Sequence, residues 1–165
     1  MSGNESSRHP YRVGIITSSD RAFRGEMEDL SGPLIRELIE AEGFLTASYA
    51  LLPDEQALLE AELRRLCDTR SADLILTTGG TGFSPRDLMP EATAAVAERL
   101  VPGIGEAMRW NGLGITPRAM LSRAVAAIRG ETLIVNLPGS PKAVHENLDY
   151  IIPVLRHGLD MLTGR

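Results

Sequence analysis

Two aspartates stand where this sequence predicts that strands pass into helices. Asp54 follows an apolar run at 44–52, and Asp87 closes a glycine-rich segment. We expect the two on neighbouring strands. Taken singly, Asp54 is typical of a helix N-cap and Asp87 of a tight turn. Two carboxylates beside phosphate-binding loops are also what a Mg²⁺–nucleotide needs, because Mg²⁺ takes a few carboxylate oxygens together with phosphates and water. Asp20 and Asp29 would add to this acidic group.

The glycine-rich segment at 78–82 reads Thr-Gly-Gly-Thr-Gly and carries no bulky side chain. Such a loop can turn its N–H groups toward an anion or let a planar ligand lie against its backbone. A tight turn packed on a sheet is equally consistent with these residues. The loop is not a P-loop, since no Gly-Lys-Ser/Thr follows. It also lacks the Gly-x-Gly-x-x-Gly pattern after a first strand, which argues against a dinucleotide site.

A second glycine-containing loop, at 136–142, leads into the C-terminal helix. Ser140 is typical of an N-cap and Pro141 of the first helical position. The free N–H groups and positive dipole end of such a helix favour phosphate. Lys142, the only lysine of the chain, lies in that first turn, where a cation opposes the helix dipole. We predict that an anion partner resolves the conflict, with a solvated surface lysine as the alternative.

The histidines and the single cysteine of this sequence do not indicate a catalytic or metal site. No Ser–His–Asp spacing or metal-ligand spacing involves His9, His145 or His157, which we interpret as surface or packing residues. The single cysteine, Cys67, excludes an intrachain disulfide and a cysteine metal cluster, and it is typical of a small apolar residue on a helix. A hydrolase built on a histidine base is therefore disfavoured.

Composition limits the class of protein. The 165 residues are 43% hydrophobic and 24% charged, with a formal net charge of −5 and no basic run. These values are typical of one globular domain and argue against a nucleic-acid partner. No apolar run is long enough to span a membrane, and the polar N-terminus lacks the apolar core of a signal peptide. We expect a disordered arm over 1–10, a single domain over 11–165 and a cytoplasmic protein.

Hydrophobic periodicity predicts alternating strands and helices. Ser31 is typical of a helix N-cap, Leu100 completes the apolar face of a helix that starts near 89, and Pro153 is expected to kink or split the last helix. Strands separated by helices imply right-handed crossovers, and hence a three-layer α/β domain with a mainly parallel sheet and helices on both faces. The predicted strands are 12–17, 44–52, 73–77 and 132–136; the predicted helices are 31–43, 54–66, 89–100, one or two within 102–128, and one from 140.

Ligands of such sheets bind outside the carboxyl ends of the strands. The sequence places polar or glycine-rich residues after every predicted strand, so we expect all of them at one edge. They are Ser18, Ser19 and Asp20 after the first strand, Asp54 after the second, 77–82 with Arg86 and Asp87 after the third, and 136–142 after the last.

Two segments of this sequence resemble the paired signatures of the MogA/MoaB molybdenum-cofactor family, and the chain is similar also to the gephyrin G domain. The first is Thr-Thr-Gly-Gly-Thr-Gly at 77–82, followed by Pro-Arg-Asp at 85–87 and Pro-Glu-Ala-Thr at 90–93. The second is Leu-Ser-Arg at 121–123 with Asn-Leu-Pro-Gly-Ser-Pro-Lys at 136–142. The resemblance runs over 11–162. Met89 departs from it, because the family usually has threonine there.

The resemblance implies a parallel-sheet α/β fold, commonly trimeric, and molybdopterin adenylyltransferase activity with Mg²⁺ and ATP. It implies that Asp54 and Asp87 are needed for adenylyl transfer and act as the metal ligands, and that the two glycine-containing loops hold the pterin. A downstream molybdate-inserting protein would be a partner. The expected substrate-binding residues are Ser19, Asp20, Thr78, Gly79, Gly80, Thr81, Gly82, Pro138, Gly139, Ser140 and Lys142.

This chemistry explains the missing histidine base. The nucleophile would be a phosphate monoester oxygen, which is largely ionised at neutral pH because its second pKa is about 6. Two alternatives remain open from the sequence. One is a molybdopterin-binding or scaffolding module without catalysis, since one fold can host either role. The other is a general nucleotide-binding α/β enzyme, although residues 18–20 offer no glycine fingerprint for it.

Overall fold

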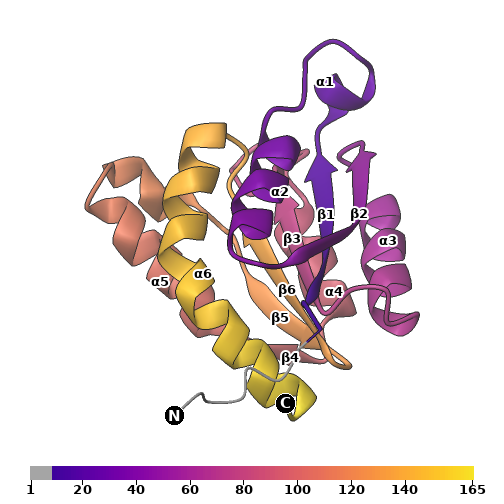
Figure 1. Cartoon of the computed structure of the whole chain (residues 1–165). Coiled ribbons are helices and arrows are strands. Elements are labelled where there is room, and N and C mark those ends of the chain that lie inside the picture. The colour runs from indigo at the N-terminus through magenta and orange to yellow at the C-terminus, as the bar shows by residue number, and fades with distance from the viewer. Residues whose placement is uncertain (1–8) are drawn as a thin grey trace.

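A single six-stranded sheet runs through the molecule in the order β2-β1-β3-β6-β5-β4 (Figure 1). The structure is a computed structural model and describes residues 9–165. Strands β2, β1, β3 and β6 are parallel, whereas β5 is antiparallel to β6 and β4 to β5. The strands are β1 Arg12–Ser18, β2 Leu45–Leu52, β3 Leu74–Thr78, β4 Arg99–Leu100, β5 Ala126–Arg129 and β6 Thr132–Leu137.

Helices cover both faces of this sheet. One apolar cluster packs α2, α5 and α6 on one face, with Ile35 and Leu148 among its buried members. The other packs α3 and α4 on the opposite face, with Leu63 and Met89 among its buried members. The predicted three-layer fold is therefore confirmed. The helices are α1 Asp20–Phe23, α2 Ser31–Ala41, α3 Gln56–Asp68, α4 Met89–Val96, α5 Pro102–Leu113, the 3₁₀ helix η1 Pro117–Leu121 and α6 Pro141–Thr163.

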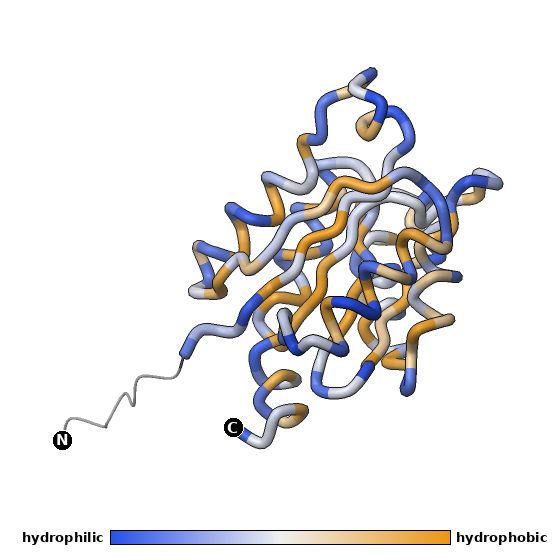
Figure 2. Tube along the Cα trace, turned by 90° about the vertical axis from the view of Figure 1, so that its right-hand side faces the viewer, coloured by the Kyte–Doolittle hydropathy of each residue, from blue (hydrophilic) through white to orange (hydrophobic). Residues whose placement is uncertain are grey.

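The central strands are buried on both faces because their sequences are almost continuously apolar. Every residue of β3 and β6 is buried, and β1 is buried after Arg12. Figure 2 shows these hydrophobic strands side by side in the interior. Their parallel registers, such as Ile15 beside Leu76 and Leu76 beside Val135, bring the carboxyl ends of the strands to the same edge of the sheet. We call it the carboxyl edge.

Two expectations about individual elements were wrong. Leu100 does not continue α4 but lies in the short edge strand β4, where it is 64% exposed. The stretch predicted as one or two helices also contains a strand, β5, which forms a hairpin with β6. Of the two outcomes expected at Pro153, the split does not occur: α6 continues through this residue, which is exposed.

The arm expected over 1–10 lies almost entirely outside the described residues; only His9 and Pro10 are seen, and both are exposed. Within residues 9–165, none of the helices combines the length and the apolar character needed to cross a membrane.

Candidate active site

Four chain segments that are distant in sequence meet at the carboxyl edge. The Ser18 hydroxyl at the end of β1 donates to Asp54 Oδ1 beyond β2 at 2.5 Å. The Thr78 hydroxyl at the end of β3 donates to the carbonyl of Pro138, beyond β6, at 2.7 Å. The end of β1 therefore contacts the segment after β2, and the end of β3 contacts the segment after β6, at the edge where the sequence predicted these polar residues.

Glycine is required at this edge because two loops approach each other at backbone level. Gly79 has φ +88, and a Cβ there would lie 2.2 Å from the carbonyl oxygen of Ser18. Gly80 also has positive φ, at +68. On the other side, a Cβ on Gly139 would lie 3.5 Å from Gly79 Cα. The two glycine-containing loops thus lie side by side, with backbone rather than side chains between them.

Asp54 is tied to the end of β1 and not to the helix that follows it. Its Oδ2 accepts from the N–H of Asp20 at 3.0 Å, and its own N–H donates to Asp20 Oδ1 at the same distance. Helix α3 begins at Gln56 and has no side-chain N-cap bond. The N-cap prediction for Asp54 was therefore wrong, because both carboxylate oxygens are engaged with Ser18 and Asp20.

Asp87 forms the turn that ends the glycine-rich loop. Its Oδ2 accepts from the N–H of Ser84 at 2.9 Å, and its N–H donates to the Ser84 carbonyl at the same distance. The carboxylate lies against Gly82, where a Cβ would come within 2.9 Å of Oδ2. Asp54 and Asp87 do not follow neighbouring strands, contrary to expectation, since β1 lies between β2 and β3.

Arg123 joins the two signature segments physically. Its Nε donates to the carbonyl of Gly82 at 2.7 Å and its Nη2 to the carbonyl of Asp87 at 2.6 Å. It also forms an ion pair with Glu91 in the first turn of α4. The pKa of Glu91 is lowered, chiefly by this hydrogen bond. Arg123 therefore fixes both ends of the Gly82–Asp87 turn, a role that its position in the sequence did not indicate.

Arg86 spans the edge between the glycine-rich loop and the end of β1. Its Nε and Nη2 donate to the two oxygens of Asp20 at 2.8 and 2.9 Å. The hydrogen bond from Arg86, followed by that from the Asp54 N–H, lowers the pKa of Asp20. Asp20 thus contacts both Asp54 and Arg86 and connects two loops of the site.

The loop after β6 is held by the start of α2. The Ser31 hydroxyl donates to the carbonyl of Gly139 at 2.7 Å. Ser31 is not the N-cap that the sequence predicted, because Asp29 Oδ1 accepts from the N–H groups of Ser31 and Gly32 at 3.1 and 3.0 Å. Asp29 Oδ2 accepts from the hydroxyl of Thr17 at 2.7 Å. Asp29 therefore contributes to the site by orienting α2 and not as a free carboxylate.

Three of the predicted substrate-binding residues lie at helix starts. Ser140 Oγ accepts from the Ala143 N–H at 3.3 Å, which confirms it as the N-cap of α6. Ser19 Oγ accepts in the same way from the N–H of Ala22 and caps α1. The side chain of Lys142 is 80% exposed, and its Nζ lies 3.7 Å from Glu146. Its role toward an anion stays a prediction.

Two side chains near the loops serve the interior. Asn136 is fully buried and donates from Nδ2 to the hydroxyls of Thr77 and Thr93, while its Oδ1 accepts from the Val125 N–H. Met89, the departure from the family pattern, is also fully buried in the cluster of α3 and α4. The methionine side chain therefore points away from the carboxyl edge and into the core.

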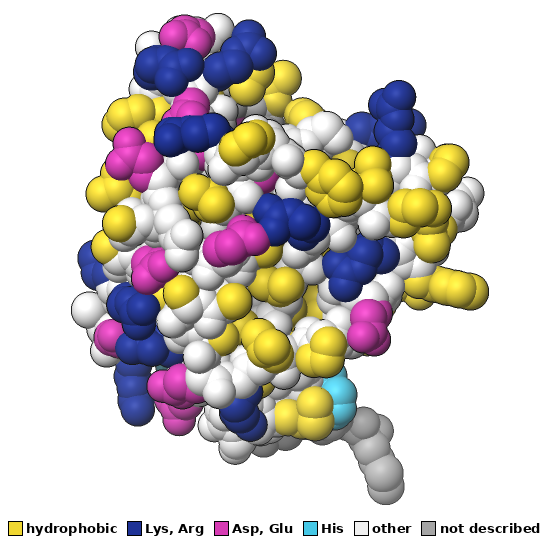
Figure 3. Space-filling view, turned by 180° about the vertical axis from the view of Figure 1, so that it is seen from behind, with side chains coloured by type: hydrophobic (Ala, Val, Ile, Leu, Met, Phe, Trp, Pro, Cys, Tyr) yellow, Lys and Arg dark blue, Asp and Glu magenta, His cyan; other side chains and the backbone are white. Residues whose placement is uncertain are grey.

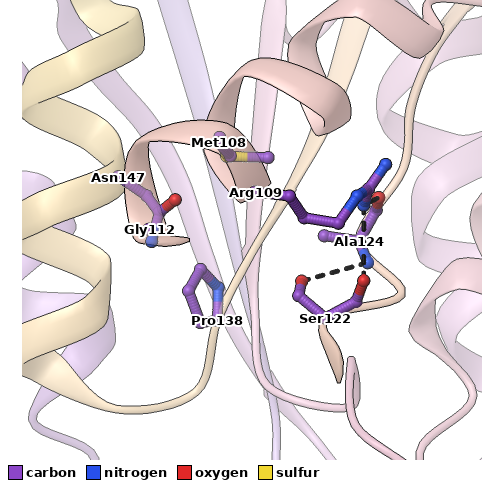
Figure 4. A pocket seen from close by; sticks show the side chains of 7 residues that line it. All are labelled: Met108, Arg109, Gly112, Ser122, Ala124, Pro138 and Asn147. Carbon is purple, nitrogen blue, oxygen red and sulfur yellow. Dashed lines mark hydrogen bonds between the residues drawn. The ribbon is translucent and has the colours of Figure 1, made fainter. Parts of the chain in front are cut away.

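A small cavity of about 30 Å³ lies beside the second loop, between α5 and α6 (Figure 4). Arg109 closes one side by donating from Nη1 to the Ala124 carbonyl at 2.8 Å. A volume of this size holds one or two waters and no fused-ring ligand, so the open carboxyl edge is the better candidate for a substrate. The cavity is lined by Met108, Arg109, Gly112, Ser122, Ala124, Pro138 and Asn147.

Fold and site together define a three-layer α/β protein with paired glycine loops and aspartates at the carboxyl ends of its parallel strands, an arrangement suited to phosphate-bearing ligands. A family model described as a probable molybdopterin binding domain matches residues 14–157. The chain belongs to this family, which confirms the resemblance seen in the sequence.

Curated relatives and solved structures support the same family assignment. The chain is 42% identical over 154 residues to a molybdopterin adenylyltransferase of Helicobacter pylori strain J99, covering 92% of this chain and 88% of that protein. It is 46% identical to the Escherichia coli K12 protein of the same name, covering 84% and 72%. The crystal structure of the molybdopterin biosynthesis enzyme MoaB from Thermus thermophilus superimposes with a TM-score of 0.89 at 51% identity, covering 94% and 98%.

Proposed function

We propose that this protein is a nucleotidyltransferase of molybdenum-cofactor biosynthesis, which transfers an adenylyl group from ATP to molybdopterin. A phosphate oxygen of molybdopterin attacks the α-phosphorus of ATP, a new P–O bond forms, and the bond to the β-phosphate breaks to release pyrophosphate. One observation supports this most strongly: both aspartates and both glycine loops lie at a single edge. The Thr78–Pro138 hydrogen bond joins the two loops, and the hydrogen bonds between Asp54 and Asp20 and between Asp20 and Arg86 connect the two aspartate segments.

The work required of the protein is positioning and charge neutralisation, because the attacking phosphate is already ionised and needs no base. The loop at 78–82 would contribute backbone N–H groups from positions without bulky side chains, and α6 offers free N–H groups at its start. Ser18 and Asp20 fix the orientation of Asp54, while Arg123 fixes the turn that carries Asp87. Each aspartate is therefore held by a different part of the chain and presented at the same edge.

The donor set fits Mg²⁺ that arrives with the nucleotide. Within residues 9–165, no group of three or more His, Cys, Asp or Glu side chains could hold a metal by itself. Mg²⁺ commonly uses one or two carboxylates together with substrate phosphates, so Asp54 and Asp87 would suffice. When bound, the ion supplies charge neutralisation on the phosphates.

The test is pyrophosphate release by purified protein from MgATP, with and without molybdopterin. We expect release only when both substrates are present. Asp54→Asn and Asp87→Asn should each lower turnover by about 10²-fold or more, the cost of losing a positioned charge, while molybdopterin binding survives. Molybdopterin binding without pyrophosphate release by the unaltered chain would favour the alternative of a scaffolding module.

We also propose a cytoplasmic homotrimer that passes its product to a molybdate-inserting protein. Large apolar side chains gather on the side of the molecule formed by α5 and η1, as Figure 3 shows, and they include Trp110, which is 77% exposed, and Met120, which is 62% exposed. A heterologous contact through such a patch closes a ring when the rotation between subunits permits. Sedimentation analysis at micromolar concentration should give three times the mass of the chain.

A further inference from the structure

Arg86 is a cation placed between the two aspartates of the proposed reaction. It lies in the segment that ends at Asp87, and its guanidinium reaches across to Asp20, which is bonded to Asp54. Its side chain is 54% exposed, whereas that of Asp20 is 21% exposed. The pKa of Arg86 is raised first by the hydrogen bond to Asp20, and the negative charges of Asp54 and Glu55 raise it further. Arg86 is therefore a solvent-accessible cation beside these carboxylates.

Asp20 does not depend on Arg86 alone. Its Oδ1 accepts from the Asp54 N–H at 3.0 Å as well as from Arg86 Nη2 at 2.9 Å. If Arg86 turned away, the Asp20 carboxylate would keep this backbone hydrogen bond and its contact with solvent. The Asp20–Arg86 ion pair can therefore open without leaving an unpaired buried charge, which would be the costly outcome.

A triphosphate that approaches this edge meets like charges. Asp20, Asp54 and Asp87 repel it unless cations intervene. Lys142 lies in the first turn of α6, which follows β6. Arg86 lies closer to the ends of β1 and β2, because it is bonded to Asp20, which in turn is bonded to Asp54. The planar guanidinium binds phosphate oxygens in the same bidentate manner as it binds a carboxylate. The Arg86 side chain can thus exchange the Asp20 carboxylate for a phosphate of the nucleotide.

We propose that Arg86 binds the polyphosphate of ATP by exchanging partners, and that Asp20 holds Arg86 in place until the nucleotide arrives. The inference rests on the proposed function and adds a nucleotide-binding residue to it. Asp20 then has a specific effect on affinity: because it competes with the phosphates for Arg86, it weakens nucleotide binding.

The test is calorimetric binding of Mg²⁺ α,β-methylene-ATP, which cannot donate its adenylyl group. Arg86→Ala should raise the Kd by about tenfold or more, and Arg86→Lys should raise it less because the charge remains. Asp20→Asn, which keeps an acceptor for the Asp54 N–H, should lower the Kd severalfold. In the double variant the gain from Asp20→Asn should disappear, since no arginine is left to be released.

The sign of the Asp20→Asn effect separates this proposal from a purely structural pair. If the pair only braces the two loops, both single substitutions weaken binding, and the proposal is overturned. The matched control is the Asp68–Arg129 pair, equally bidentate at 2.8 and 3.0 Å but between α3 and β5. Asp68→Asn should leave the Kd unchanged. Thermal melting of every variant checks that the fold persists.

The outcomes also separate this inference from the proposed function. If the unaltered chain does not bind the analogue, both are wrong. If it binds the analogue and responds to the substitutions as expected, yet releases no pyrophosphate with molybdopterin present, the adenylyl-transfer proposal fails while the role of Arg86 stands. If it binds the analogue and Arg86→Ala binds equally well, the role of Arg86 is wrong.

Discussion

The two ends of the parallel sheet each carry an aspartate bound to an arginine, but the two pairs are built differently. At the amino end, Asp73 accepts from the N–H, Nε and Nη2 of Arg12 at 2.8, 3.2 and 3.0 Å. Arg12 is therefore its partner through both backbone and side chain. At the carboxyl edge, Asp20 accepts from Arg86 at both oxygens and also from the N–H of Asp54 at Oδ1.

The difference follows from what each pair joins. Arg12 and Asp73 lie at the starts of the adjacent strands β1 and β3, whose paired residues Val13 and Leu74 fix their separation. Asp20 begins the short helix α1 and Arg86 lies on a loop, and neither position is set by sheet pairing. A charge pair anchored by two strands stabilises the fold, whereas one that joins two loops can rearrange when a ligand binds. Function is therefore expected at the carboxyl edge and stability at the amino end.

Gly79→Ala should have the largest effect, because it breaks the carboxyl edge itself. The backbone has φ +88 and the new Cβ would lie 2.2 Å from the Ser18 carbonyl oxygen. Left-handed strain and a backbone clash together should cost about 3 kcal/mol or more in the free energy of unfolding, with loss of adenylyl transfer. Chemical denaturation and pyrophosphate release measure the two effects.

Gly130→Ala is the matched control for that substitution. Gly130 turns the β5–β6 hairpin with φ +57, and a Cβ there meets nothing within 4 Å. Only the left-handed strain remains, about 1–2 kcal/mol, and activity should persist. If the two variants lost equal free energy of unfolding, the close approach of Gly79 to the Ser18 carbonyl would not contribute to stability.

Asp73→Asn should come next, with an effect on stability and none on binding. Loss of a charge-assisted hydrogen-bond set should cost about 2 kcal/mol at pH 7, while the Kd for the nucleotide analogue stays the same. Asp20→Asn should shift the melting temperature less, because its side chain is more exposed and its partners lie on loops. If Asp73→Asn also changed the Kd, the division between the two ends would be wrong.

The pH dependence of stability gives the same comparison without a ligand. Burial opposes ionisation of Asp73, yet the hydrogen bonds from Arg12 outweigh it and lower the pKa of that carboxyl. A carboxyl with a lowered folded-state pKa stabilises the fold above its unfolded-state pKa, about 4, and this contribution is lost as the pH falls further. The unaltered chain should therefore lose stability more steeply below about pH 4 than Asp73→Asn does.

The sequence was most informative where the signal is local. The apolar runs at 12–17, 73–77 and 132–136 are short but almost continuously apolar, and helical patterns separate them. Three central parallel strands and the polar residues after them could therefore be predicted. Strand β4 has two residues and β5 four, and neither run differs from a helical segment in composition. Residues 126–129 form a strand because they pair with β6, and such pairing depends on tertiary contacts that a local sequence pattern does not show.

Hydrogen-bond partners could not be predicted because they depend on tertiary contacts. Ser31 and Asp54 both have the residue type and position of an N-cap, yet Ser31 donates to Gly139 and Asp54 binds residues after β1. The first N–H groups of the helix that Ser31 was expected to cap donate to the side chain of Asp29 instead. The roles of Arg86 and Arg123 likewise depend on loops that meet only in the folded chain.

Lys142→Ala should have the smallest effect and tests how far the carboxyl edge extends. Its ammonium is largely solvated and near Glu146, so an ion pair with substrate phosphate would gain little in water. We expect the Kd for molybdopterin, measured by fluorescence or calorimetry, to rise about two- to fivefold, and stability to stay the same. His145→Ala is the control, because His145 lies in the same helix, is near Asp149 and has a side chain that is 54% exposed. If neither substitution changes affinity, the anion site at 138–142 consists of backbone N–H groups alone, and the sequence argument from the single lysine is wrong. A tenfold or larger effect of Lys142→Ala would instead show that bound substrate shields this lysine from water and that the carboxyl edge reaches the first turn of α6.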